Sequence, residues 1–123
     1  MLEERVVRAV EAFGDIDRVY IARHFKIRDF SGTSAMVASL DTKPRQTLGR
    51  NNAVFEDIRI SLDLSRSLAR SKEIAESLFD FLIAYEGEGL YFLPLKLPIL
   101  SGKNENNRWE YVLEGRFIEN KEE

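Results

Sequence analysis

The N-terminal residues show the first regular pattern of hydrophobic and polar positions. Hydrophobic side chains recur there at helical spacing, at Leu2, Val6, Ala9, Val10 and Phe13. Charged side chains fall on the opposite side, at Glu3, Glu4, Arg8 and Glu11. This spacing predicts an amphipathic helix of about three turns. Gly14 stands where a glycine commonly ends a helix.

Short strands and one long loop are predicted for the next part of the chain. Residues 19–21 and 35–40 are mostly apolar runs of strand length, and a polar stretch over 23–32 separates them. Between residues 41 and 53 the pattern disappears, and Pro44, Gly49 and the asparagines at 51 and 52 mark a loop long enough to suspect a function. From residue 57 to 64 hydrophobic and polar side chains alternate, which predicts a strand with one side in water.

A long helix is predicted directly after this strand, over residues 67–85. Its hydrophobic side chains form one broad stripe, at Ile74, Leu78, Phe81, Leu82 and Tyr85, which Ala75 and Phe79 widen. Lys72, Glu73, Glu76 and Asp80 fall on the side expected to face water. Gly87 and Gly89 are expected to end the helix.

The C-terminal part reads as an edge strand, a turn and a closing strand. Residues 91–97 are strand-like but contain Pro94, and proline lacks the N–H group that an interior strand needs, so an edge strand or strand-like arm is expected. Residues 101–108 are rich in Asn and Lys and predict a turn. Trp109, Tyr111, Leu113 and Phe117 then alternate with charged residues in a last strand, and residues 119–123 form a charged tail.

These elements predict a single two-layer α+β domain over residues 1–123, in which a small mixed or antiparallel sheet packs against two helices. The chain has 123 residues, the size of one domain, and 44% of them are hydrophobic. It contains no cysteine, which excludes disulfides and cysteine-ligated metal centres. The formal net charge of −3 gives no overall basic footprint for nucleic acid.

Neither a membrane span nor a secretory signal is expected. Every apolar run is far shorter than the ~20 residues that a membrane-spanning helix needs. The N-terminus carries Glu3 and Glu4 beside Arg5 in place of a continuous apolar segment. We therefore expect the protein to be made and folded in a reducing cytoplasm.

No catalytic, cofactor-binding or metal site is predicted. His24 is the only histidine and lies near Arg23, Lys26 and Arg28, which would lower the pKa of its imidazole. No glycine-rich nucleotide-binding string and no G-x-S-x-G string occurs. The carboxylate pairs Glu56–Asp57 and Glu73–Glu76 are expected on solvent faces, so a glycosidase-type pair is not favoured.

Two charged groups are candidates for contacts with a neighbouring subunit or partner. The loop at 41–53 holds Lys43, Arg45 and Arg50 against one acid, Asp41. It can be a mobile soluble loop, or it can pack on a neighbour, since arginine is enriched at interfaces. Glu110, Glu114 and Glu119 crowd the outer side of the last strand and its tail. In a head-to-tail ring the two groups would belong to adjacent subunits.

The aromatic residues do not follow the pattern of a nucleic-acid stacking platform. Phe79 and Phe81 belong to the helix stripe, and Trp109 and Tyr111 alternate in a strand without interleaved Lys or Arg. A core or subunit-interface position is favoured for them.

The order of these elements resembles the small minor capsid and tail-terminator (tail-completion) proteins of long-tailed bacteriophages. The first stretch that carries the resemblance is FLPLKLPILSGKNENNRWEYVLEGRFI, residues 92–118, where an apolar, proline-containing arm leads through a polar turn into an aromatic strand. The second is DIRISLDLSRS followed at once by the helix LARSKEIAESLFDFL. The similarity covers roughly residues 2–118, although the basic segment over 23–28 is longer than the family pattern.

The resemblance implies a structural virion protein and no enzyme. It implies a ring, expected to be a homo-hexamer, that caps the tail tube and joins it to the head connector or stopper. The DNA would pass through the lumen without specific binding, and the protein would reside at the tail end or head–tail junction. A mildly acidic subunit suits such a passage because attraction to each phosphate would impede it.

Three alternatives remain open from the sequence. A head-completion protein of similar size would share the same pattern. A protein- or peptide-binding module could use the edge strand over 90–97. A small hydrolase or nuclease with an unrecognised site is the third.

Overall fold

The computed structural model describes residues 2–22, 32–40, 46–47, 53–85 and 87–120. Two helices and seven strands make up these residues, in the order α1 (Leu2–Phe13), β1 (Arg18–Ile21), β2 (Ser34–Ser39), β3 (Gln46–Thr47), β4 (Ala53–Asp63), α2 (Leu68–Ala84), β5 (Leu90–Pro94), β6 (Ile99–Lys103) and β7 (Trp109–Asn120). A single 3-10 turn, η2 (Gly87–Gly89), precedes β5.

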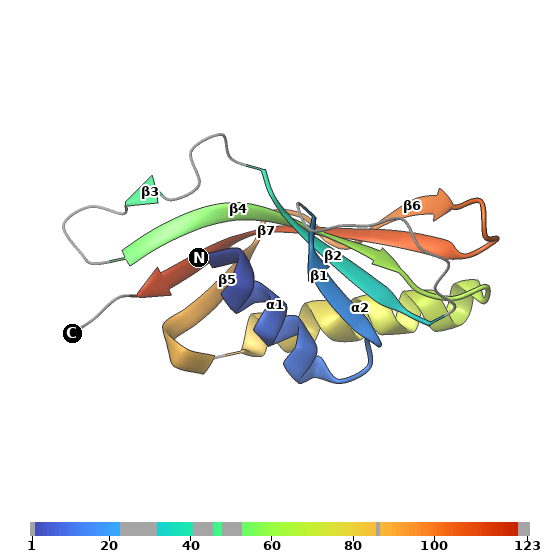
Figure 1. Cartoon of the computed structure of the whole chain (residues 1–123), viewed down its shortest axis with the longest axis horizontal. Helices are drawn as coiled ribbons and strands as arrows, with labels where there is room; N and C mark the ends of the chain where they lie inside the picture. Colours follow the sequence, from blue (N-terminus) through green and yellow to red (C-terminus); the bar gives the residue numbers. More distant parts are fainter. Residues whose placement is uncertain (1, 23–31, 41–45, 48–52, 86, 121–123) are drawn as a thin grey trace.

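The strands form one mixed sheet with the order β1-β2-β4-β7-β5. Only β1 and β2 are parallel among these pairs, and β4 and β7 form the long antiparallel centre. β3 pairs with the start of β4, and β6 pairs with the start of β7. Both helices cover the same face of the sheet (Figure 1). The predicted two-layer α+β fold, with its mixed sheet and two helices, is therefore confirmed.

The core lies between the sheet and the two helices, and the long helix α2 contributes the predicted stripe. Ile74, Leu78 and Leu82 are buried there together with Ile58 and Ile60 of β4, as the helix stripe predicts. Phe81, which the same stripe places in the core, is only partly buried, because it lies on the flank of α2 that faces α1. Its ring packs 5.5 Å from that of Phe13 and 5.8 Å from that of Tyr85, so it joins the two helices.

The ends of the helices follow local rules. The side chain of Ser67 caps α2 by accepting a hydrogen bond from the backbone N–H of Arg70 at 3.2 Å. Gly14 ends α1 with a φ of +90°, a conformation that favours glycine. The helix α2 ends at Ala84, one residue before the predicted end at residue 85 and ahead of Gly87 and Gly89.

Two predicted segments differ from the structure in their extent, and one residue differs in its burial. The predicted loop over 41–53 contains β3, and β4 begins within it at Ala53, because β7 is long enough to pair with β4 as far as Asn120. The predicted turn over 101–108 is strand up to Lys103, because β6 continues the pairing with β7. Glu3 was expected on the polar side of α1 but is buried. Its carboxylate accepts a hydrogen bond from the backbone N–H of Ser39 at 3.3 Å.

Within the described residues, no helix is both long and apolar enough to cross a membrane.

Candidate interaction surface

A run of exposed apolar side chains lies along one edge of the sheet. We call residues 91–100, which include most of β5 and the start of β6, the apolar arm. Six large apolar side chains of this arm are between 41% and 75% exposed, namely Tyr91, Leu93, Leu95, Leu97, Ile99 and Leu100. Exposed patches of this kind mark interaction sites in soluble proteins. The arm is therefore the candidate interaction surface, and its place at an edge confirms the edge strand predicted from Pro94.

Within the described part of the chain, no strand pairs with the edge of β5 that faces away from β7. Successive residues of a strand direct their backbone groups to alternate edges. Leu95 donates its backbone N–H to the carbonyl of Glu114 in β7 at 3.1 Å, so the odd-numbered residues bond to β7. The backbone groups of Leu90, Phe92 and Pro94 consequently point to the open edge. This edge offers two N–H donors and three carbonyl acceptors, because Pro94 has no N–H.

The connection from β5 to β6 interrupts the edge. Pro94 pairs with Gly115, and Ile99 pairs with Val112. The arm therefore advances by five residues where β7 advances by three. A further irregularity follows between Leu100 and Gly102. The extra residues push the chain outward, and Leu97 among them is 75% exposed. Irregularities of this kind limit how far a foreign strand can pair along an edge.

Close packing beneath β5 fixes the position of this edge. The ring of Phe92 packs over Gly115 of β7, where a side chain would collide with it. The same ring lies 4.9 Å from that of Phe117 and meets the ring of Phe79 in α2 edge-on at 6.0 Å. These three aromatic rings tie β5, β7 and α2 together. This packing holds β5, and with it the open edge, in a fixed position.

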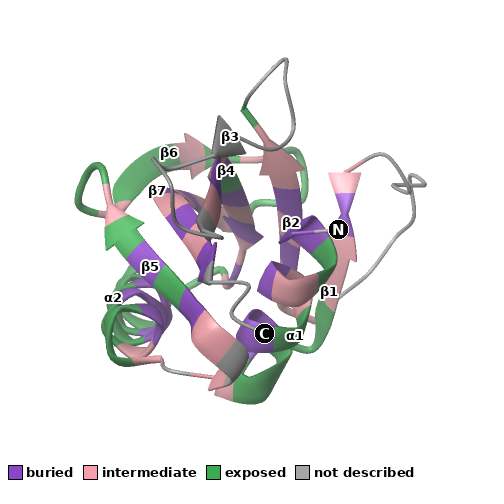
Figure 2. Ribbon diagram, turned by 90° about the vertical axis from the view of Figure 1, so that its left-hand side faces the viewer, coloured by how far each residue is buried: buried purple, intermediate pink, exposed green. Residues whose placement is uncertain are grey.

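The helix layer also exposes an apolar side chain at this edge. Phe79 marks the flank of α2 that faces β5, and Ile83 follows one helical turn later on the same flank. Ile83 is 48% exposed. In Figure 2, β5 lies at the side of the molecule with α2 below it, and both show exposed residues.

The centre of the sheet face that points away from the helices is charged. Arg116 of β7 donates two hydrogen bonds to Asp57 of β4, at 2.9 and 3.3 Å. Next along the same strands, Arg59 donates to Glu114 at 2.8 Å, and Lys96 of the arm lies 3.4 Å from the other oxygen of Glu114. The hydrogen bond from Arg59 lowers the pKa of Glu114, and the charge of Lys96 adds to this effect. Opposite charges are thus paired within the subunit.

The predicted interface acids already have partners in their own subunit. Glu114 binds Arg59 and Lys96, and Glu110 accepts a hydrogen bond from the side chain of Asn104 at 3.1 Å. Reversing the charge of Glu114 would therefore alter the subunit as well as any interface. Three predicted interface cations, Lys43, Arg45 and Arg50, lie outside the described residues, as does His24.

A group of buried charged side chains lies where α1 starts. Arg5 forms an ion pair with Glu119, and the side chains of the two residues are 14% and 10% exposed. The expected place of Glu119 on the outer side of the last strand is therefore wrong. Glu56 is 2% exposed, so its expected place on a solvent face is wrong. Even-numbered residues of β4 face the helices, and the early start of β4 includes Glu56 in that set. Among the described residues, no group of three or more His, Cys, Asp or Glu side chains could hold a metal ion.

The sequence signalled the arm only in part. Pro94 indicates an edge strand, and the residues around it are mostly apolar. The exposure of the arm was not predictable, because a helix or a loop can cover an edge strand as well.

Comparison with known proteins assigns the chain to no family. No family model matches it, and no curated protein matches it. Among solved structures, the chain is similar to one described as the structure of bacteriophage SPP1 gp17 protein. The two are 16% identical in sequence with a TM-score of 0.46, and the match covers 98% of this chain and 89% of that chain.

Proposed function

We propose that this chain is a structural virion protein of a long-tailed bacteriophage. In this proposal it is a tail terminator, which assembles into a ring, caps the tail tube and joins it to the head connector. The observation that carries the proposal is the apolar arm on an open sheet edge. A subunit with six large apolar side chains exposed along one edge needs a protein partner to cover them.

The elements that carry the sequence resemblance occur in the expected order. β4 ends at Asp63 and α2 starts at Leu68, so the strand runs almost directly into the long helix. The arm leads through the turn over 104–107 into the long aromatic strand β7. These features support the family resemblance independently of any sequence signature.

The charge pattern is compatible with DNA passing by without being held. The cations on the open face of the sheet are already matched by carboxylates, as in the Asp57–Arg116 and Arg59–Glu114 pairs. The whole chain carries a formal net charge of −3. A phosphate backbone therefore finds the arginines of these two pairs already neutralised on this face.

A peptide- or protein-binding module is the second candidate. The donors and acceptors on the open edge of β5 favour it, because an extended peptide can add a strand there. Pro94 would stop such a strand after a few residues. A head-completion protein would use the same arm at a neighbouring position in the virion.

Tail tubes test the proposal directly. Tubes made from the tail tube protein encoded in the same genome should be incubated with this chain and viewed by negative-stain electron microscopy. Rings should appear at one end of each tube, and capped tubes should stop growing when more tube protein is added. Tubes without the chain provide the growth control. Uncapped tubes that grow at the control rate, together with tight binding of an extended peptide, would favour the binding module.

A further inference from the structure

We propose that two copies of this chain pair side by side through the apolar arm. Their β5 strands lie antiparallel across a twofold axis at Phe92 and join the two sheets into one. The occupant of the arm is thus a second copy of the chain. This pairing does not depend on the phage role.

Among the described residues, no other surface is as apolar as the arm, so its best apolar partner is the arm of a second copy. All exposed large apolar side chains of the described residues lie in the arm or at Ile83 beside it, apart from Leu40 and Leu68. The β1 edge at the far side of the sheet presents no matching set, because Arg18 is its exposed residue. A twofold axis places each patch against its own copy, as isologous contacts require.

The apolar area is close to what a stable dimer needs. Tyr91, Leu93, Leu95, Leu97 and Ile83 are between 48% and 75% exposed. At roughly 150 Å² for each whole side chain, they expose on the order of 400 Å² per copy. Two copies would remove at most about 800 Å² before the strand edges are counted, and a specific interface needs about 1,000 Å² in total.

The backbone groups of the open edge suit antiparallel pairing of two β5 strands. With the axis at Phe92, its N–H donates to the carbonyl of the partner's Phe92, and the reverse bond forms as well. The N–H of Leu90 donates to the carbonyl of the partner's Pro94. The missing N–H of Pro94 therefore costs one bond on each side, and four bonds remain across the axis.

The side chains favour this register. Tyr91 faces the partner's Leu93 on the open face of the sheet, so two apolar pairs form, each with its members close together. Antiparallel pairing also carries Leu95 and Leu97 toward the partner's residues just before β5, where Ile83 is exposed. An axis at Tyr91 would allow four bonds too, but it would place Leu93 opposite a glycine, Gly89.

The pairing has a consequence for larger assemblies. A twofold contact closes on itself and yields a dimer. A ring then needs a second contact, for which the basic residues Lys43, Arg45 and Arg50 and the acids Glu110 and Glu114 remain candidates. A ring that contained both contacts would have two equivalent faces, whereas a cap between a tail tube and a head connector has two different ones, so the pair belongs to the free protein and separates when such a ring forms.

Mass measurement in solution is the first test. Size-exclusion chromatography with light scattering should give twice the chain mass of 14.2 kDa. Leu93→Glu should raise the dissociation constant of the dimer at least tenfold, because it places a carboxylate in the apolar contact. Leu40→Glu is the matched control, since Leu40 is also exposed but lies outside the arm. It should leave the dissociation constant unchanged.

Disulfide trapping is the second test. The chain has no cysteine of its own, so only the introduced cysteines can form disulfides. In the proposed register, a Tyr91→Cys and Leu93→Cys double variant should form covalent dimers on mild oxidation. The Leu93→Cys single variant should form few, because its two copies lie about 7–8 Å apart on a diagonal. Tail tubes are absent from both tests, so their outcome is separate from that of the capping experiment.

Several results would overturn the pairing. A wild-type chain that stays monomeric up to about 1 mM binds itself too weakly for the proposed contact. A dimer that Leu93→Glu does not weaken uses another surface. Efficient trapping by Tyr91→Cys alone would move the axis and refute the register. If the chain is a monomer and its arm is covered only when a tail tube or a peptide is present, that partner and not a second copy is the occupant of the arm.

Discussion

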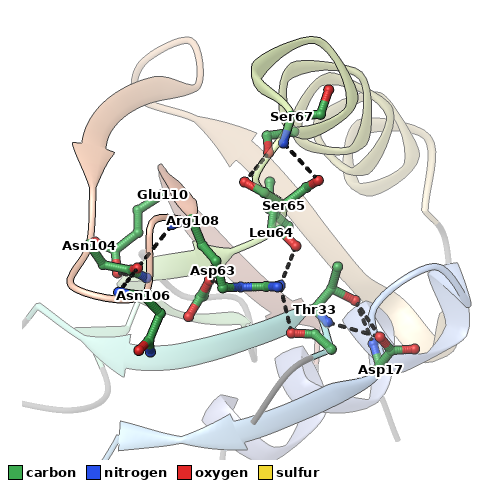
Figure 3. Close-up of polar contacts among 12 residues, drawn as sticks. Asp17, Thr33, Asp63, Leu64, Ser65, Ser67, Asn104, Asn106, Arg108 and Glu110 are labelled. Carbon is green, nitrogen blue, oxygen red and sulfur yellow. Dashed lines mark hydrogen bonds and ion pairs between the residues drawn. The ribbon is translucent and has the colours of Figure 1, made fainter. Parts of the chain in front are cut away.

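Arg108 joins three segments that are distant in the sequence, and its removal should destabilise the fold. Its Nε donates to Asp63 at 2.8 Å, and its Nη2 donates to the carbonyl of Gly32 at 2.7 Å and to that of Leu64 (Figure 3). The side chain is only 11% exposed. The turn over 104–107 positions it, because the side chain of Asn104 accepts the backbone N–H of Arg108 at 3.2 Å.

The expected cost of Arg108→Ala follows from the groups that lose their donor. Leu64 is 1% exposed, so water cannot fully replace the donor to its carbonyl, which costs about 1–3 kcal/mol. The side chain of Asp63 is 30% exposed and is partly rehydrated, so the lost ion pair adds only about 1 kcal/mol. We therefore expect the free energy of unfolding to fall by about 2–4 kcal/mol.

Urea unfolding at one fixed protein concentration measures this change, since self-association would otherwise shift the apparent stability. Arg59→Ala is the matched control. Arg59 also forms a cross-strand ion pair, but its side chain is 47% exposed. Its removal should cost less than about 1 kcal/mol. Arg108→Lys should fall between the two alanine variants, because lysine keeps the charge without the planar set of donors.

A difference of less than about 0.5 kcal/mol between Arg108→Ala and Arg59→Ala, with equal denaturant slopes, would contradict this expectation. In that case burial would not decide the strength of these pairs in this protein.

Four further changes test other parts of the structure. Leu78→Ala should lower the free energy of unfolding by about 2–5 kcal/mol in urea, because Leu78 is fully buried, and a near-neutral effect would contradict its core position. Gly115→Ala should cost about 1–3 kcal/mol by overpacking the aromatic ring above it, and an unchanged urea midpoint would speak against that close contact. Reversing Arg45 and Arg50 to Glu should slow ring assembly, followed by light scattering, while leaving the urea midpoint unchanged, and assembly at the wild-type rate at every salt concentration would refute that contact. The backbone N–H and the hydroxyl of Thr33 donate hydrogen bonds to Asp17 and hold the pKa of its carboxyl group below the usual value. This carboxylate therefore stabilises the fold at neutral pH, and the stabilisation is lost as the pH falls through the pKa in the folded state. Asp17→Asn should therefore show a shallower loss of stability in acid unfolding, and a profile identical to that of the wild type would contradict the assignment.

The sequence alone determined the elements whose signal is local. The spacing of Leu78 and Leu82 predicted the buried stripe of α2, and Gly14 marked the end of α1 through its backbone preference. Pro94 indicated an edge strand because its missing N–H is tolerated there. Each of these signals depends on residues within a few positions of one another.

Only the tertiary structure decided which surface is exposed and which polar groups are buried. Glu56 and Glu3 lie inside because long-range pairing extends β4 and because Ser39 offers a donor to Glu3. The apolar arm is exposed because β5 ends the sheet and no described element covers its far edge. An apolar run has the same sequence pattern in a central strand and at an edge. What distinguishes the two is the presence of a neighbouring strand, and that depends on residues far away in the chain.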